Sequence, residues 1–191
     1  MYFSKRLLKV ASITLITILC VFAYLTYFDS KGDKSKHAET AALIGGKFKL
    51  FDQDGKSVSD KNLLGKKTLV LFGFSKCPHI CPNQLSMLEL SLEKYPNLQA
   101  FFITLDPKND DVDTLKEFHE KFHPRIKMLT GDLYVIDKLA SDYKVFVSRD
   151  DDPEKFNHSS IMYLMGKNGQ YVAHFTPKNE DELLKDLQDF V

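Results

Sequence analysis

The chain of 191 residues carries 26 basic and 26 acidic side chains, so its formal charge at neutral pH is zero. This length suits one folded domain with an attached segment, and a hydrophobic content of 43% supplies an ordinary core. The balanced charge argues against a nucleic-acid partner, which would need a basic surface.

An apolar run without formal charges occupies residues 10–28 near the N-terminus. As a helix it would span roughly 28 Å, enough to cross the hydrocarbon core of a bilayer. Basic residues within 1–9 precede the run, so the positive-inside rule puts residues 1–9 in the cytoplasm and the rest of the chain outside. We therefore expect one transmembrane helix at 10–28 and a tether at 29–44, with the following domain in the periplasm.

Other targeting signals fit this N-terminus less well. Cleavage of a signal peptide near Ala23 stays open, but no small-x-small site closes the run cleanly. Cys20 lacks the small preceding residues of a lipoprotein signal, and we expect it to be a passive membrane-buried cysteine. No arginine-rich transit peptide is present, which favours the bacterial cytoplasmic (inner) membrane over the mitochondrial inner membrane.

The elements expected after the tether alternate between strands and helices. Continuous apolar runs are typical of strands that are covered on both faces, whereas leucines at helical spacing indicate amphipathic helices. In chain order we expect a β-hairpin at 46–58, a strand at 67–74, a helix at 82–95, a strand at 98–105, a helix at 110–123, a short apolar segment at 126–129, a helix at 132–143, a strand at 144–148, a hairpin at 160–175 and a helix at 180–190. This order predicts an α/β, thioredoxin-like fold over residues 45–191, with an N-terminal β-hairpin extension and an inserted helix.

Two cysteines, Cys77 and Cys81, lie between the strand at 67–74 and the helix that Pro82 is expected to begin. At such a turn, free backbone N–H groups and the positive end of the helix dipole favour the thiolate, so we expect both thiols to lose protons readily. The three residues between the cysteines leave room for one ion to bind both sulfurs. A structural disulfide is an alternative, but so short a loop gives little loop-closure stabilisation.

A third donor is needed, because two thiolates alone leave a copper ion under-coordinated. The chain has six histidines: His37, His79, His119, His123, His158 and His174. Of these, His158 immediately precedes the first strand of the C-terminal hairpin. In a thioredoxin-like fold that loop lies beside the cysteines, so we expect His158 to approach them.

The run from His119 to His123 matches the His-Glu-x-x-His pattern of zinc proteases. That chemistry needs both histidines on one stable helix, a third ligand and an open position for water. Pro124 disfavours helical geometry at the residue before it, and the helix around residues 117–121 is charged. We therefore do not expect a metalloprotease.

Taken together, the motifs of residues 45–190 resemble the SCO/SenC family of copper-binding cytochrome c oxidase assembly proteins. The resemblance rests on Asp-Gln-Asp-Gly at 52–55, Phe-Gly-Phe-Ser-Lys-Cys-Pro-His-Ile-Cys-Pro at 72–82, Thr-Leu-Asp-Pro at 104–107, Leu-Thr-Gly at 129–131, His-Ser-Ser at 158–160 and Val-Ala-His-Phe at 172–175. It implies that Cys77, Cys81 and His158 bind one copper ion. It also implies that copper or reducing equivalents pass to the CuA centre of cytochrome c oxidase subunit II, or to another cuproprotein.

The sequence departs from the family pattern close to this site. His79 and Asn157 stand where the family usually has acidic residues, and His79 either competes as a ligand or tunes the basicity of the thiolates. Asp106 matches a family loop near the site, where it would lie outside the ligand shell.

The leading hypothesis is a copper metallochaperone, which binds and transfers a metal and is not an enzyme. The alternative is a membrane-anchored thiol–disulfide oxidoreductase that acts on cuproprotein cysteines, with Cys77 attacking and Cys81 resolving the mixed disulfide. That activity needs neither His158 nor a metal. A peroxiredoxin would need Pro-x3-Thr/Ser-x2-Cys ahead of its nucleophile, and the residues before Cys77 do not supply it.

Overall fold

The computed structural model describes residues 15–25, 44–78 and 80–191. Residues 15–25 are helical with exposed side chains, and the described residues from 44 onward form one compact unit. Within the described ranges, no helix is both long enough and apolar enough to span a membrane. Residues 10–14 and 26–28 of the expected anchor, and residues 29–43 of the expected tether, lie outside those ranges.

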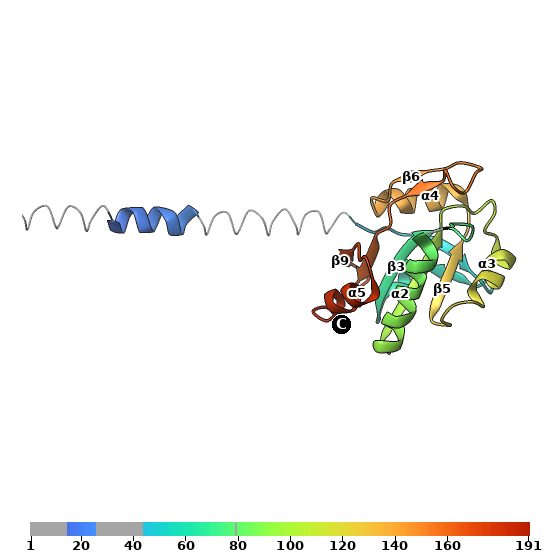
Figure 1. Cartoon of the computed structure of the whole chain (residues 1–191), viewed down its shortest axis with the longest axis horizontal. Helices are drawn as coiled ribbons and strands as arrows, with labels where there is room; N and C mark the ends of the chain where they lie inside the picture. The colour runs from blue at the N-terminus through green and yellow to red at the C-terminus, as the bar shows by residue number, and fades with distance from the viewer. Residues whose placement is uncertain (1–14, 26–43, 79) are drawn as a thin grey trace, which may run out of the picture. The chain divides into compact units, whose positions relative to one another are not determined.

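A mixed sheet forms the centre of the domain (Figure 1). Among the described residues it has seven strands in the order β2-β1-β5-β4-β3-β8-β9. Their bounds are β1 Lys49–Asp52, β2 Ser57–Ser59, β3 Lys67–Gly73, β4 Leu98–Thr104, β5 Ile126–Thr130, β8 Met162–Met165 and β9 Tyr171–Phe175. The strands β3, β4 and β5 are parallel to one another, and the other pairs are antiparallel. The ends of β3, β4 and β5 therefore meet at one edge of the sheet.

Helices cover both faces of this sheet. Their bounds are α2 Ile80–Lys94, α3 Val112–His119, α4 Leu133–Asp142 and α5 Glu180–Leu187, with a 3₁₀ turn, η1, at Asp60–Leu63. Because side chains alternate along a strand, Leu69 and Leu71 of β3 enter one core with α2, α3 and α5, whereas Val70 and Phe72 enter the other with α4. The strand β3 is thus buried on both faces, as its apolar run predicts.

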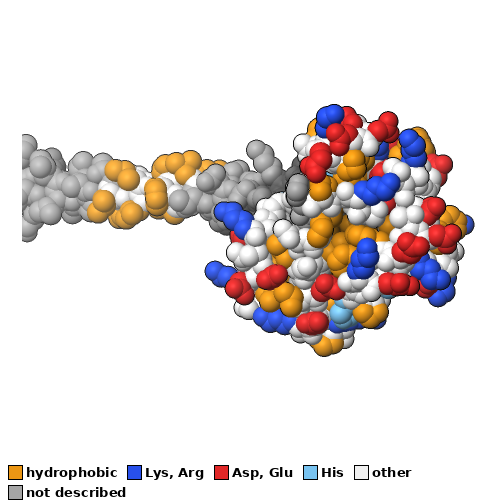
Figure 2. Space-filling view, turned by 45° about the vertical axis from the view of Figure 1, so that its right-hand side comes forward, with side chains coloured by type: hydrophobic (Ala, Val, Ile, Leu, Met, Phe, Trp, Pro, Cys, Tyr) orange, Lys and Arg blue, Asp and Glu red, His pale blue; other side chains and the backbone are white. Residues whose placement is uncertain are grey.

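Charged side chains of both signs are interspersed on the face of the domain shown in Figure 2. This distribution agrees with the zero formal charge of the whole chain. That face shows no continuous patch of a single sign of charge.

The order of the elements confirms the predicted α/β, thioredoxin-like fold. The helix expected at 110–123 is shorter, α3 at Val112–His119, and two expected strand segments also differ in detail. The segment at 126–129 is a full strand, β5, between β4 and β1. The expected strand at 144–148 shrinks to β6, Val147–Ser148, which pairs with β7, Asn157–His158, outside the main sheet. It starts late because Lys144 (φ 60°) and the hydrogen bond from Val145 N–H to the Ala140 carbonyl still belong to the end of α4.

Candidate metal centre

The two cysteines lie where β3 passes into α2. Cys77 is in the connecting loop and is partly buried, whereas Cys81 lies inside the first turn of α2 and is fully buried. The expectation that both cysteines precede the helix is therefore wrong for Cys81. The first N–H groups of a helix have no acceptor within it, so Pro82 is tolerated anywhere in the first turn and need not begin the helix.

The sulfur of Cys81 packs directly against the end of β3. A Cβ atom at Gly73 would lie 2.7 Å from Cys81 Sγ and 2.8 Å from Cε2 of the Phe102 ring. Both distances are far shorter than an ordinary van der Waals contact. This sulfur can therefore occupy its position only because residue 73 is a glycine and has no Cβ atom.

A buried carboxylate holds the loop before Cys77. Asp110 is fully buried, and its Oδ2 accepts hydrogen bonds from the Ser75 backbone N–H (3.0 Å) and from Thr104 Oγ1 (2.5 Å). Its Oδ1 accepts a further bond from the Ser75 hydroxyl. Burial raises the pKa of the Asp110 carboxyl above its usual value. Asp110 thus ties the Cys77 loop to the end of β4.

In this region the sequence motif points to Asp106 and gives no sign of the role of Asp110. Asp106 makes only a local turn, in which its Oδ2 accepts a hydrogen bond from Asn109 Nδ2 and its carbonyl accepts from the N–H groups of Asn109 and Asp110. The available signal was a second acidic residue in the segment between the buried strand β4 and the helix α3. Nothing in that pattern indicates which of the two carboxylates turns inward.

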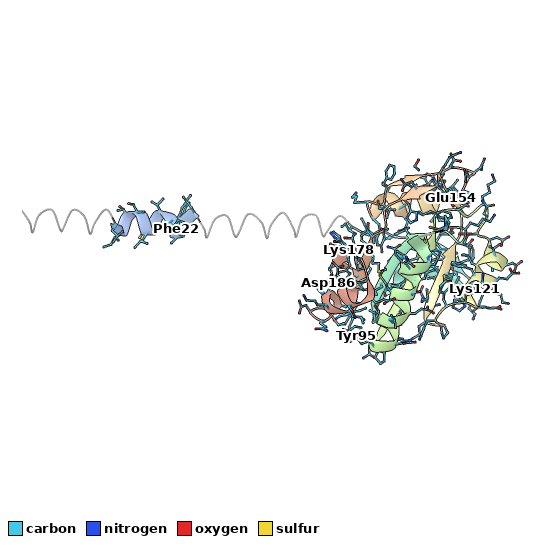
Figure 3. The ribbon with its side chains drawn as sticks, in the orientation of Figure 1. Phe22, Tyr95, Lys121, Glu154, Lys178 and Asp186 are labelled. Atoms are coloured by element: carbon cyan, nitrogen blue, oxygen red, sulfur yellow. The ribbon has the colours of Figure 1, made fainter. Side chains whose placement is uncertain are left out.

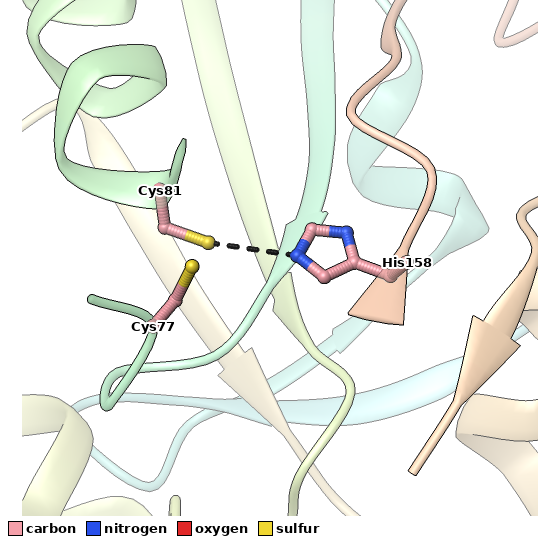
Figure 4. Close-up of side chains that lie close together, drawn as sticks. All are labelled: Cys77, Cys81 and His158. Carbon is pink, nitrogen blue, oxygen red and sulfur yellow. Dashed lines mark hydrogen bonds between the residues drawn. The ribbon is translucent and has the colours of Figure 1, made fainter. Parts of the chain in front are cut away.

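His158 lies in β7 and is buried, and it faces the two sulfurs (Figure 4). Its Nε2 atom is 3.7 Å from Cys81 Sγ, and its Nδ1 atom is 3.0 Å from the backbone carbonyl oxygen of Ser159. Because a carbonyl oxygen only accepts hydrogen bonds, Nδ1 carries the proton of the neutral ring and Nε2 presents its lone pair. The imidazole ring and the Phe74 ring form a T-shaped pair, at 5.9 Å between centroids, and Phe74 in turn contacts Phe156.

The three predicted residues converge. One ligand atom from each of Cys77, Cys81 and His158 lies within 4.8 Å of the other two. No second group of three or more histidine, cysteine or acidic side chains with such geometry occurs in the part of the chain that the structure describes. Two sulfurs and one imidazole nitrogen form a donor set that suits copper ions.

Cys77 and Cys81 are not joined by a disulfide in this structure. The pKa of Cys81 is raised, first by its hydrogen bond with Cys77 and then by burial. The expectation that helix-capping thiols lose protons readily is therefore wrong for Cys81, because the loss of water and the neighbouring sulfur outweigh the helix dipole. In the metal-free protein this thiol keeps its proton at neutral pH, and a bound metal would have to displace it.

The other histidines that the structure describes lie outside this cluster. The helix α3 ends at His119, so His119 and His123 do not share a helix, and His123 Nδ1 accepts a hydrogen bond from the Arg125 N–H. His174 is exposed, with its Nδ1 atom 2.6 Å from the Tyr171 hydroxyl. His37 and His79 lie outside the described residues.

Comparison with known proteins identifies similar chains and similar structures. The family model described as SCO1/SenC matches residues 36–191. An SCO2-like protein of Rickettsia prowazekii is 39% identical over 146 residues, which cover 72% of this chain and 71% of that protein.

Two solved structures match most of the described domain. The structure of Bradyrhizobium japonicum ScoI with copper bound has 34% sequence identity and a TM-score of 0.67, and the match covers 78% of this chain and 99% of that one. The crystal structure of yeast Sco1 with copper bound has 35% identity and a TM-score of 0.69, with coverage of 77% and 87%. These similarities agree with the fold described above.

Proposed function

Because the chain belongs to the SCO1/SenC family, we propose that it is a copper metallochaperone for cytochrome c oxidase assembly. Cys77, Cys81 and His158 bind one copper ion, and the acceptor is the CuA centre of oxidase subunit II. The observation that carries this proposal is the convergence of two sulfurs and one imidazole nitrogen within 4.8 Å. The bound copper in two similar structures supports the choice of metal.

The protonation of the three side chains determines how they take up the metal. In the neutral ring of His158 the proton is on Nδ1 next to the Ser159 carbonyl, so Nε2 presents its lone pair to the metal. Cys81 is a buried thiol with a raised pKa, so binding releases its proton. Three protein donors leave room for a ligand of the acceptor, so the ion passes on by exchange of ligands.

A competition titration tests the three-donor site. The reduced full-length protein is titrated anaerobically with Cu(I) against a chelator of known affinity. We expect one copper per chain. His158→Ala should lower the copper affinity at least about tenfold, because that much is typically lost even when a residue that only positions a metal ligand is replaced. His174→Ala is the matched control, since this exposed histidine lies outside the cluster. Equal affinities for His158→Ala and the parent would reject the site.

Delivery needs a separate test. The copper-loaded full-length protein is mixed with a metal-free CuA domain, and the absorption of the mixed-valence CuA centre is followed. We expect the CuA absorption to develop with the parent and to be lost with Cys77→Ser. If the parent binds copper but transfers none under any redox condition, the metal site stands and the delivery role fails.

A thiol–disulfide oxidoreductase is the second candidate, and the unequal exposure of the cysteines favours it. Partly exposed Cys77 would attack an acceptor disulfide, and buried Cys81 would resolve the mixed disulfide, leaving a Cys77–Cys81 disulfide and a reduced acceptor. Reduction of a CuA-loop disulfide by the copper-free His158→Ala variant distinguishes the two functions. Reduction at the parental rate would favour the oxidoreductase over the chaperone.

We place the protein in the bacterial cytoplasmic membrane, anchored by residues 10–28, with its domain in the periplasm. The uncharged run and the preceding basic residues support this location. Protease added to intact spheroplasts should digest the domain. Protection from the protease until the cells are lysed would contradict this topology.

A further inference from the structure

The hairpin that carries His158 stands apart from the main sheet. Its strands β6 and β7 pair only with each other among the described strands. The loop between them projects from the domain beside α4 (Figure 1), and Figure 3 shows Glu154 of this loop at the end of the domain opposite Tyr95. Main-chain pairing with the central sheet therefore does not set the place of His158.

Arg149 bridges the hairpin to the body of the domain. It directly follows β6, whose last residue, Ser148, pairs with the neighbour of His158. Its Nε atom donates a hydrogen bond of 2.9 Å to the Leu105 carbonyl at the end of β4. The same guanidinium group forms an ion pair with Asp137 of α4. One side chain thus binds the hairpin to a strand end and to a helix.

Open space lies on both sides of this bridge. An open cavity of about 610 Å³ is bounded by Arg149, the turn around Lys108 and the hairpin loop with Phe156. A second open cavity, of about 510 Å³, lies between Arg149, Phe146 and the α4 residue Asp137. Because Arg149 lines both cavities, little packing beside it would replace its contacts if they were lost.

We propose that Arg149 is a positioning residue that fixes the hairpin so that His158 Nε2 faces the two sulfurs. The inference rests on the proposed function only for its effect on copper. The hairpin also packs on the domain through Phe156 against Phe74, at 4.3 Å between ring centroids, and through Val147 against the buried core. These apolar contacts are less directional than the hydrogen bonds of Arg149. A guanidinium group can reach the carbonyl and the carboxylate at once, whereas a lysine ammonium can meet only one of them in the same geometry.

The first test needs no metal. Hydrogen exchange of the backbone amides in residues 146–159 is measured in the copper-free full-length protein. Arg149→Ala should accelerate exchange in this segment, with little change in β3 or β4. The exchange rates of Arg149→Lys should lie between those of Arg149→Ala and those of the parent. Lys108→Ala is the matched control, because its bond to Asp151 joins two largely exposed groups. Unchanged exchange in Arg149→Ala would overturn the inference.

The second test is a double-mutant cycle on copper affinity. Arg149→Ala should weaken Cu(I) binding by about tenfold and change the Cu(II) spectrum toward that of His158→Ala, while Lys108→Ala leaves both unchanged. In the His158→Ala background, Arg149→Ala should have no further effect. If its effect on copper persists there, Arg149 does not act through His158 and the inference is overturned. If exchange accelerates but His158→Ala binds copper as the parent does, the positioning role stands and the three-donor site fails.

Discussion

Replacement of Gly73 with alanine tests whether the position of the Cys81 sulfur determines metal binding. The new methyl group would lie 2.7 Å from Cys81 Sγ and 2.8 Å from Phe102 Cε2. The first distance falls short of an ordinary 3.4 Å contact by about 0.7 Å. Both neighbours are fully buried, so neither can move without disturbing the packing around it.

The expected magnitude follows from this crowding. Overpacking of a core by one methyl group costs about 1–3 kcal/mol. In the metal-free protein Cys81 can relieve part of this strain by turning its sulfur away, but a metal holds the sulfur to within about 0.2 Å of a fixed bond length. Copper binding therefore restores the strain. A difference of about 1–2 kcal/mol corresponds to a loss of affinity of roughly 5- to 30-fold.

Gly131→Ala provides the matched control for Gly73→Ala. Its Cβ would lie 2.8 Å from Cδ2 of Leu50, the end of a flexible side chain that does not belong to the cysteine cluster. Both variants of the full-length protein are studied by urea unfolding and by Cu(I) competition. Both should lose stability, and only Gly73→Ala should lose copper affinity. Parental affinity in Gly73→Ala would refute the argument that the glycine sets the place of the sulfur.

Three further predictions concern groups around the site and the far end of α2. Burial raises the pKa of the Asp110 carboxyl in the folded protein, so the protonated carboxyl stabilises the fold. This stabilisation is complete below the pKa of the unfolded chain, near 4, and is lost as the pH rises through the pKa of the folded protein. The difference in unfolding free energy between parent and Asp110→Asn should therefore shrink from pH 4 to pH 7 in urea titrations, and a constant difference would contradict the shift. The raised pKa of Cys81 likewise stabilises the folded protein, fully below the unfolded thiol pKa of about 8.5 and less as the pH rises above it. In urea unfolding, the metal-free parent should therefore lose stability between about pH 8 and pH 10 more steeply than Cys81→Ser. Arg125 donates hydrogen bonds to the carbonyls of residues 92, 95, 96 and 98, so Arg125→Ala should cost about 1.5–3 kcal/mol in urea unfolding and leave Cu(I) affinity unchanged.

Much of the sheet could be predicted because burial leaves a local mark in the sequence. The apolar runs of β3 and β4 are covered on both faces, and such strands need no alternation of polar and apolar residues. The turn between β8 and β9 is marked by Gly169, whose φ of 74° suits glycine. Chain order then places the segment before β8 beside the start of α2. The approach of His158 to the cysteines followed from that topology, and the structure puts its Nε2 atom 3.7 Å from Cys81 Sγ.

What the sequence could not supply depends on contacts between distant segments. Strands of two residues, such as β6 and β7, are too short to show an alternating pattern. The inward turn of Asp110 depends on Ser75, which lies 35 positions earlier in the chain. The protonation of Cys81 was misjudged for the same reason, because a helix dipole is a local property whereas burial is set by the whole fold.

The three donors are held with different firmness, and this difference bears on the proposed transfer. Cys81 is enclosed between α2 and β3, and Cys77 is on a loop that Asp110 ties to the end of β4. His158 is on a hairpin that Arg149 and an aromatic contact attach to the rest of the domain. A transfer protein must bind its ion firmly enough to capture it and must still yield ligands to an acceptor. His158, whose hairpin lies outside the main sheet, meets the second requirement of the proposed transfer without any movement of the buried thiol.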